Sequence, residues 1–263
     1  MASPNPFDQQ AKIPGVKHII AVSSGKGGVG KSTVSTHLAL ALAKRFKVGI
    51  LDADIYGPSL PRMLGCLKQK PAITPEQKLI PIERYGLKIM SIGFLIEETA
   101  AVVWRGPMLF KAMDQFLRDV QWGELDFLIV DLPPGTGDVQ LSLAQKVPLA
   151  GAVIVSTPQN ISLIDVKKAV DMFQRLQVPL LGVVENMAYM INPVNGERMQ
   201  LFPKGEIDSY FESIKVPKLG EVPFNSNVGL ASEAGIPVIE SYPNSPESLE
   251  FKKIADTLAA RFN

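Results

Sequence analysis

The chain carries the stretch Gly25-Lys26-Gly27-Gly28-Val29-Gly30-Lys31-Ser32-Thr33 shortly after an apolar run, Ile19-Ile20-Ala21-Val22. This stretch fits G-x-x-x-x-G-K-[ST], the pattern of a phosphate-binding loop between a strand and a helix. Glycines let the backbone turn tightly and direct its N–H groups at phosphate oxygens, and a helix that begins near Gly30 adds the positive end of its dipole. The sequence therefore predicts a nucleotide site, in which Lys31 neutralises the β- and γ-phosphates and the Ser32 hydroxyl faces magnesium.

Composition narrows the possible partners and compartments. Lysine and arginine number 27 against 26 aspartates and glutamates, so the overall charge gives no reason to expect nucleic acid as a partner. The single cysteine, Cys66, cannot form an intramolecular disulfide, which fits a reducing compartment. No apolar run approaches the roughly 18 residues of a membrane span, and the N-terminus lacks the pattern of a signal peptide. We expect a soluble, cytoplasmic protein whose residues 1–263 form one domain, because no linker divides them.

Short β-branched runs alternate with helical patterns along the chain. The predicted strands are 18–23, 47–51, 87–92, 127–130, 152–156 and 180–184. The predicted helices are 32–44, 107–119 and 161–176. This alternation predicts an α/β fold in which a doubly wound, mostly parallel sheet is covered by helices on both faces. Ligands of such folds bind at the carboxyl ends of the strands, where the phosphate-binding loop also falls.

Two further segments have a predicted structural role. Ser245 and Pro246 open a C-terminal helical pattern whose apolar residues, Phe251, Ile254, Ala255, Leu258, Ala259 and Phe262, share one face. We favour packing of this face on its own domain over contact with a membrane or a partner. Residues 68–86 combine three prolines with charged residues and predict an exposed excursion between strands.

An apolar run at residues 127–130 ends in Asp131, and this pattern is typical of a carboxylate that holds magnesium, usually through water. The segment that follows contains Pro134, Gly135, Gly137 and Asp138. Prolines stiffen this segment and glycines permit its backbone to rearrange, so it is expected to respond to loss of the γ-phosphate. Alternatively, Asp138 caps a helix over residues 139–146.

Three residues suit a pocket for the nucleotide base. Asn186 follows the predicted strand 180–184 and offers an amide that can pair with the adenine edge. Pro223 and Phe224 offer a flat apolar wall. A turn-forming asparagine and an ordinary core phenylalanine are the competing interpretations.

Four blocks resemble the Mrp family of P-loop ATPases, and the similarity runs from about Gly15 to the C-terminus. The blocks are Ser24-Gly25-Lys26-Gly27-Gly28-Val29-Gly30-Lys31-Ser32-Thr33, Leu51-Asp52-Ala53-Asp54-Ile55-Tyr56-Gly57-Pro58-Ser59, Val130-Asp131-Leu132-Pro133-Pro134-Gly135-Thr136-Gly137-Asp138 and Glu185-Asn186-Met187. The Tyr-Gly-Pro-Ser and Pro-Pro-Gly-Thr-Gly-Asp sequences separate the chain from MinD and ParA relatives. Lys26 matches the early lysine of the deviant Walker A signature K-G-G-x-G-K-[ST].

The resemblance implies a dimeric ATPase that binds MgATP or MgADP and acts as an iron-sulfur cluster scaffold or carrier. It implies that Lys26 reaches the nucleotide of the partner subunit, that Asp54 orients the attacking water and that Asp52 lies near magnesium. A solvated lysine and ordinary strand-end aspartates are the alternatives. A cation that arrives only in the dimer would couple assembly to the nucleotide state.

The chain departs from the family at its cluster-binding motif. The family places C-P-x-C shortly after Glu-Asn-Met, whereas this chain has Asn192-Pro193-Val194-Asn195. Neutral amides are poor substitutes for thiolates, and we interpret Cys66 as a small buried hydrophobe. A soft metal site at Met187, Met190 and Met199 is less favoured than packing.

The sequence thus predicts an ATPase with an iron-sulfur role by resemblance. The alternative is a metal-free, MinD- or ParA-like switch that is gated by nucleotide. A protein client or a cysteine-bearing homologue is a further possible partner.

Overall fold

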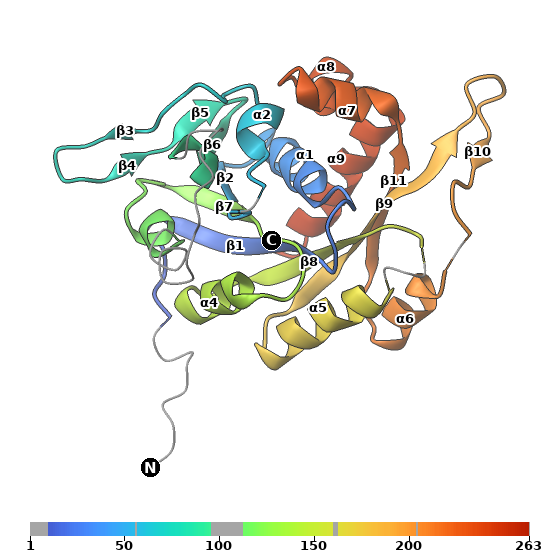
Figure 1. The fold of residues 1–263 in the computed structure, drawn as a ribbon, viewed down its shortest axis with the longest axis horizontal. Helices are drawn as coiled ribbons and strands as arrows, with labels where there is room; N and C mark the ends of the chain where they lie inside the picture. The colour runs from blue at the N-terminus through green and yellow to red at the C-terminus, as the bar shows by residue number, and fades with distance from the viewer. Residues whose placement is uncertain (1–9, 56, 96–112, 160–162, 204, 263) are drawn as a thin grey trace, which may run out of the picture.

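The computed structural model describes residues 10–55, 57–95, 113–159, 163–203 and 205–262, which form a nine-stranded, mostly parallel sheet (Figure 1). The strand order is β10-β9-β8-β1-β7-β2-β6-β5, and β11 pairs with β9. The parallel strands are β1 (Val16–Ser24), β2 (Val48–Asp52), β6 (Leu87–Ser91), β7 (Leu125–Asp131), β8 (Gly151–Ser156), β9 (Leu180–Ile191) and β11 (Lys218–Phe224). The short strands β5 (Ile82–Arg84) and β10 (Arg198–Met199) are antiparallel to β6 and β9.

Helices cover both faces of the sheet (Figure 1). One face carries α1 (Lys31–Ala43), α2 (Leu60–Met63), α7 (Ser226–Glu233), α8 (Val238–Ser241) and α9 (Pro246–Ala259). The other carries α4 (Asp138–Lys146) and α5 (Leu163–Arg175), with α6 (Ile207–Ser213) beside α5. The predicted doubly wound α/β class is therefore confirmed.

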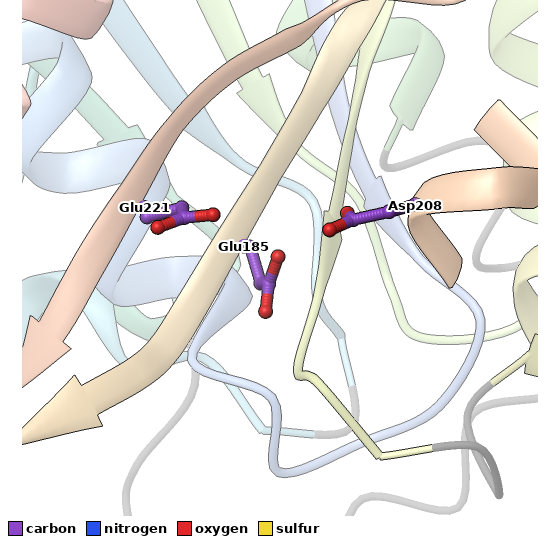
Figure 2. A group of neighbouring side chains, drawn as sticks. All are labelled: Glu185, Asp208 and Glu221. Carbon is purple, nitrogen blue, oxygen red and sulfur yellow. The ribbon is translucent and has the colours of Figure 1, made fainter. Parts of the chain in front are cut away.

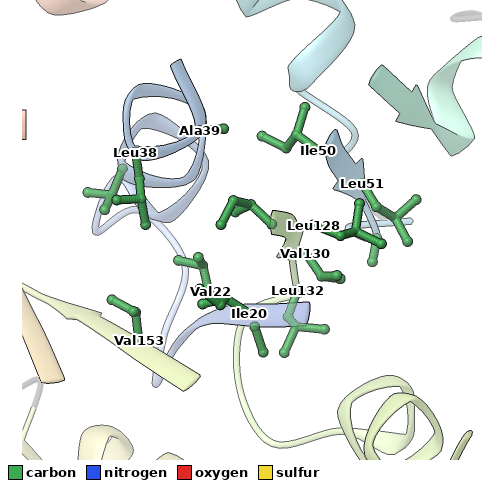
Figure 3. Packing of buried hydrophobic residues seen from close by; sticks show 14 of the residues in the cluster. Ile20, Val22, Leu38, Ala39, Ile50, Leu51, Leu128, Val130, Leu132 and Val153 are labelled. Atoms are coloured by element: carbon green, nitrogen blue, oxygen red, sulfur yellow. The ribbon is translucent and has the colours of Figure 1, made fainter. Parts of the chain in front are cut away.

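The core lies between these layers. Strands β1, β2 and β7 sit in the centre of the sheet and are buried on both faces, which is why their sequences are apolar almost throughout. Figure 3 shows side chains of these strands, Ile20, Ile50 and Leu128 among them, packed with Leu38 of α1. This packing fixes the carboxyl ends of the three strands, and the predicted site lies at those ends.

Most of the predicted elements are confirmed with small shifts at their ends, but β9 runs on to Ile191 instead of ending at residue 184. Strand β11 was not predicted, nor were β5, β10 and two short strands between residues 72 and 80. Gly220 and Pro223 interrupt the β-branched pattern of β11, which explains the omission.

Three other predictions can be compared only in part or need refinement. Of the predicted helix 107–119, residues 113–118 are helical and 107–112 lie outside the described residues. Likewise, 161–162 of the predicted helix 161–176 lie outside them. The excursion at 68–86 contains a small hairpin, β3 (Ala72–Ile73) and β4 (Leu79–Ile80), before β5 joins the main sheet.

The C-terminal helix α9 packs on its own domain, as predicted. The Ser245 hydroxyl accepts a hydrogen bond from Ser248 N, and Pro246 occupies the first turn. Phe251, Ile254 and Leu258 are buried against the rest of the core. Across the described ranges, no helix has both the length and the apolar character that crossing a membrane requires.

Candidate functional site

The phosphate-binding loop connects β1 to α1, and its glycines are required by close approaches. A Cβ added to Gly25 would lie 2.3 Å from the carbonyl carbon of Asp165, so the start of α5 leaves no room for a side chain there. Gly30 has a φ of +79°, and an added Cβ would lie 2.1 Å from the Asn186 amide nitrogen. Glycine is therefore required at Gly25 by the close approach of α5, and at Gly30 by both its positive φ and the Asn186 amide.

Asp131, at the end of β7, is the hub of a buried polar network. Its Oδ1 lies 2.8 Å from Lys31 Nζ and accepts a hydrogen bond of 2.7 Å from the Ser35 hydroxyl. Its Oδ2 accepts a hydrogen bond of 2.6 Å from the Ser32 hydroxyl. Lys31 and Asp131 are both buried. Lys31 and the Ser32 hydroxyl are thus hydrogen-bonded to the carboxylate that is predicted to hold magnesium.

Asp52 lies next to Asp131, since the two residues are in register across β2 and β7. Its carboxylate accepts hydrogen bonds of 3.2 Å from Leu60 N and 3.0 Å from the Ser91 hydroxyl. It also accepts one of 3.2 Å from Asp54 N. Burial, and then the negative charge of Asp131, raise the pKa of Asp52 to about 7.

Negative charge exceeds positive charge at the end of the loop. Asp54 Oδ2 lies 3.6 Å from Lys31 Nζ, so the Lys31 ammonium has both Asp54 and Asp131 as ion partners, with Asp52 beside them. Carboxylate and hydroxyl oxygens are the ligands that magnesium prefers, and a surplus of negative charge attracts a divalent cation. Ser32, Asp52 and Asp131 therefore fit the predicted magnesium site.

A cavity of about 470 Å³ opens over this network. The loop contributes Lys26, Lys31 and Thr33 to its lining, and Asp54 and Pro134 extend it. The remaining wall comes from α2 and α7 and comprises Ser59, Arg62, Met63, Val228, Gly229, Ser232 and Glu233. Its volume is in the range of small-molecule sites, about 300–1,000 Å³.

The predicted switch segment lies at the edge of this cavity. Gly135, with a φ of +88°, donates its N–H to Ser24 O at 2.9 Å. The Gln140 amide donates to Pro133 O at 2.8 Å and to Gly135 O at 3.0 Å, so a side chain of α4 holds the segment. The capping alternative for Asp138 is wrong, because α4 begins at Asp138 and the capping position is Gly137. The Asp138 side chain lies outside what the structure describes.

The three residues predicted for the base pocket do not lie together in the cavity wall. Asn186 lies within β9, not after it, and its amide donates to Val29 O at 2.9 Å. It thus contacts the phosphate-binding loop directly. Pro223 and Phe224 end β11, and Phe224 is 43% exposed. The cavity lining includes residues of α7 instead, and the roles of these three residues with adenine stay predictions.

Asn192 and Asn195 lie in the hairpin between β9 and β10, which projects from the body of the molecule (Figure 1). Asn192 Oδ1 accepts a hydrogen bond from Val194 N, and Asn195 Oδ1 accepts one from Glu197 N. Both side chains therefore stabilise the turn itself, as asparagines commonly do. Val194 at the tip is 92% exposed.

Cys66, His37 and two of the methionines have structural surroundings. Cys66 is 1% exposed, and burial raises the pKa of its thiol to about 11, which confirms its interpretation as a buried hydrophobe. His37 is buried in α1 and stacks on Phe251. Met190 and Met199 are cross-strand neighbours in β9 and β10.

Three carboxylates gather at one edge of the sheet, from Glu185 of β9, Asp208 of α6 and Glu221 of β11 (Figure 2). The Lys218 ammonium contacts all three, at 2.7 Å, 2.5 Å and 2.9 Å. Burial lowers the pKa of Lys218, but hydrogen bonds to Asp208, Glu185 and Glu221 outweigh it and the pKa is raised. The single ammonium offsets one of the three negative charges and links all three carboxylates, so the cluster acts as an ionic tie between β9, α6 and β11.

Sequence reasoning missed several residues of the site. Ser35 has a local signal, because it lies four residues after Lys31 and faces the same side of α1. Gln140 and the residues of α2 and α7 have no such signal. They reach the cavity only through the packing of the helices.

Comparisons with known proteins agree with this geometry. Residues 15–259 match the ParA family model, described as NUBPL iron-transfer P-loop NTPase. The chain is 50% identical over 256 residues to the iron-sulfur cluster carrier protein of Aquifex aeolicus, covering 97% of this chain and 70% of that protein. It is 45% identical to the iron-sulfur cluster transfer protein NUBPL of Mus musculus, covering 96% and 80%.

A solved structure, the nucleotide-binding protein of Archaeoglobus fulgidus in complex with ADP, has a TM-score of 0.78 at 42% identity and covers 91% of this chain and 93% of that one. The fold, the phosphate-binding loop and the relatives all lead to the same assignment. The chain belongs to the family of NUBPL-type iron-transfer P-loop NTPases, as its motifs predicted.

Proposed function

We propose that this chain is a magnesium-dependent ATPase that works as a homodimer. One observation carries the proposal: the buried network of Lys31, Ser32 and Asp131 lies directly below a cavity large enough for one nucleotide. The ADP complex of the Archaeoglobus fulgidus relative supports a nucleotide as the ligand.

In the proposed reaction, water attacks the γ-phosphate in line with the leaving oxygen, and the chain positions the reactants. Lys31 leaves Asp131 for the phosphate oxygens, and Asp54 orients the attacking water. Ser32 and Asp131, with Asp52 next to Asp131, would hold magnesium, which would supply positive charge to the phosphate oxygens when bound. Lys26 of the partner subunit stabilises the charge that develops in the transition state.

The test compares phosphate release by the wild type, Lys26→Ala and Lys17→Ala. A charge supplied in trans contributes about 10³- to 10⁵-fold to the rate, so Lys26→Ala should lose at least about 10³-fold in turnover. Lys17→Ala is the matched control, because Lys17 is an exposed lysine near the opposite end of β1. Turnover per chain should also rise with protein concentration if the dimer is the active species.

Two outcomes would contradict the proposal. Normal turnover by Lys26→Ala would exclude a catalytic lysine in trans. The absence of calorimetric heat when the wild type is titrated with MgATP would exclude the nucleotide site itself.

The family suggests a role in assembly or transfer of iron-sulfur clusters, but the residues present do not fit a cluster held by this chain. Such clusters normally take four cysteine ligands, whereas the sequence contains one cysteine and Cys66 is buried. We therefore propose that any part in cluster transfer is played together with a client or a cysteine-bearing homologue.

The buried single cysteine also favours a second candidate, a metal-free switch that binds partners according to its nucleotide state. Anaerobic reconstitution with iron and sulfide separates the two. A stable chromophore with stoichiometric iron would support a cluster carrier and refute the switch. A colourless protein that captures a cysteine-bearing homologue only with ATP would support the joint role in cluster transfer, and a colourless protein that captures no such homologue would support the switch.

A further inference from the structure

The segment after Asp54 also contributes to the cavity, although the mechanism above gives it no role. Ser59 precedes α2 and Arg62 lies within α2, and both line the cavity over the phosphate-binding loop. Arg62 therefore places a second kind of cation, a guanidinium, in the wall of a cavity whose expected ligand is a polyanion.

Arg62 is paired with an acidic residue of α7. Its Nη1 lies 3.6 Å from Oε2 of Glu233, and their side chains are 48% and 72% exposed. Glu233 lines the same cavity, so its carboxylate would repel a polyphosphate bound there. A polyphosphate that enters the cavity would therefore attract Arg62 and repel Glu233.

Both side chains of this ion pair are largely exposed to solvent. Arg62 and Glu233 also line a second hollow of about 310 Å³, together with Gly65, Cys66 and Lys68. Both residues thus line two solvent-accessible hollows, so solvent screens their attraction. Exposed ion pairs of this kind contribute little to stability, so the guanidinium can leave Glu233 at small cost.

We propose that Arg62 is a nucleotide-binding residue, which leaves Glu233 for phosphate oxygens of a nucleoside polyphosphate in the cavity. A guanidinium binds phosphate through two parallel N–H donors, an interaction stronger than an exposed pair with one carboxylate. Glu233 acts as the competitor that holds Arg62 while the cavity is empty. The inference rests on the proposed function, because it assumes that the polyphosphate occupies this cavity.

The two partners should have effects of opposite sign on nucleotide affinity. Arg62→Ala should weaken binding about tenfold or more, since it removes a charge-assisted contact. Arg62→Lys should fall between the wild type and Arg62→Ala, because it keeps the charge and loses the paired donors. Glu233→Gln should tighten binding about twofold to fivefold, because it removes the competitor and a repulsive charge.

The experiment is titration calorimetry of the full chain with MgADP and with a non-hydrolysable MgATP analogue. Arg45→Ala is the matched control, since Arg45 is an exposed arginine paired to Asp256 at 3.0 Å and does not line the cavity. Thermal unfolding of each variant verifies that it is folded at the temperature of the titration.

Two results would overturn the inference. Equal affinities of Arg62→Ala and Arg45→Ala would show that Arg62 does not contact the nucleotide. Equal weakening by Arg62→Ala and Glu233→Gln would show that the pair only ties α2 to α7. A wild type that binds neither nucleotide would instead refute the proposed function, which makes the two failures distinguishable.

Discussion

Asp131 offers the most direct test of the buried network, through the variant Asp131→Asn. The substitution preserves the shape of the side chain and removes its charge. The amide keeps one acceptor oxygen for three donors, the Lys31 ammonium and the hydroxyls of Ser32 and Ser35. It also leaves the buried Lys31 ammonium with Asp54, at 3.6 Å, as its ion partner.

The expected loss of stability follows from burial. Removing one partner of a buried ion pair costs about 3–5 kcal/mol, because the remaining charge stays desolvated. Asp131 also repels Asp52, and this repulsion disappears in the variant. We therefore expect the lower end of the range, about 3 kcal/mol in the free energy of unfolding, or a fall in Tm of roughly 6–12 °C.

The assay is urea denaturation of the nucleotide-free protein in the presence of a chelator. Asp126→Asn is the matched control, since Asp126 lies in the same strand and pairs with Lys17 at 2.7 Å, a distance close to that of Lys31 and Asp131. Lys17 is 64% exposed and Asp126 26% exposed, so loss of this solvent-accessible pair should cost at most about 1 kcal/mol. If Asp131→Asn destabilises the protein no more than Asp126→Asn does, the buried network does not have the energy that we assign to it.

Three further predictions concern the loop and the core. Gly30→Ala should weaken MgADP binding about tenfold in calorimetry, because its φ of +79° and the Asn186 amide exclude a Cβ. Gly57→Ala should not, because its added Cβ meets no atom of the described residues within 4 Å. Burial lowers the pKa of His37 to about 4, so the unfolded chain takes up a proton first as the pH falls. The free energy of unfolding should drop by about 3 kcal/mol between pH 6.5 and 4, and His37→Phe should lose that part of the slope in urea titrations at each pH. Burial raises the pKa of Cys66 to about 11, so this thiol should react with a disulfide reagent at pH 7.5 at least about 100-fold more slowly in the native protein than in urea; fast native labelling would contradict its burial.

The sequence predicted those parts of the site that are contiguous in the chain. The loop at residues 25–33 and the strand that ends in Asp131 are local patterns, in which spacing alone fixes geometry. These local patterns were therefore sufficient to predict a phosphate-binding loop before the fold was known. Strand β11 was not, because Gly220 and Pro223 interrupt its pattern and only pairing with β9 stabilises it as a strand.

Contacts between distant segments were decided by the tertiary structure. The register of β2 against β7 brings Asp52 beside Asp131, and a one-residue slip would turn one of them to the opposite face. Helix packing brings Arg62 to Glu233 across the same cavity. Such pairs depend on strand order and helix position, which a linear pattern does not encode. The sequence by itself thus determined which ligand the loop is built for, while the assembled sheet determined which charges surround that ligand, because electrostatic interactions depend on distance in space and not on separation along the chain.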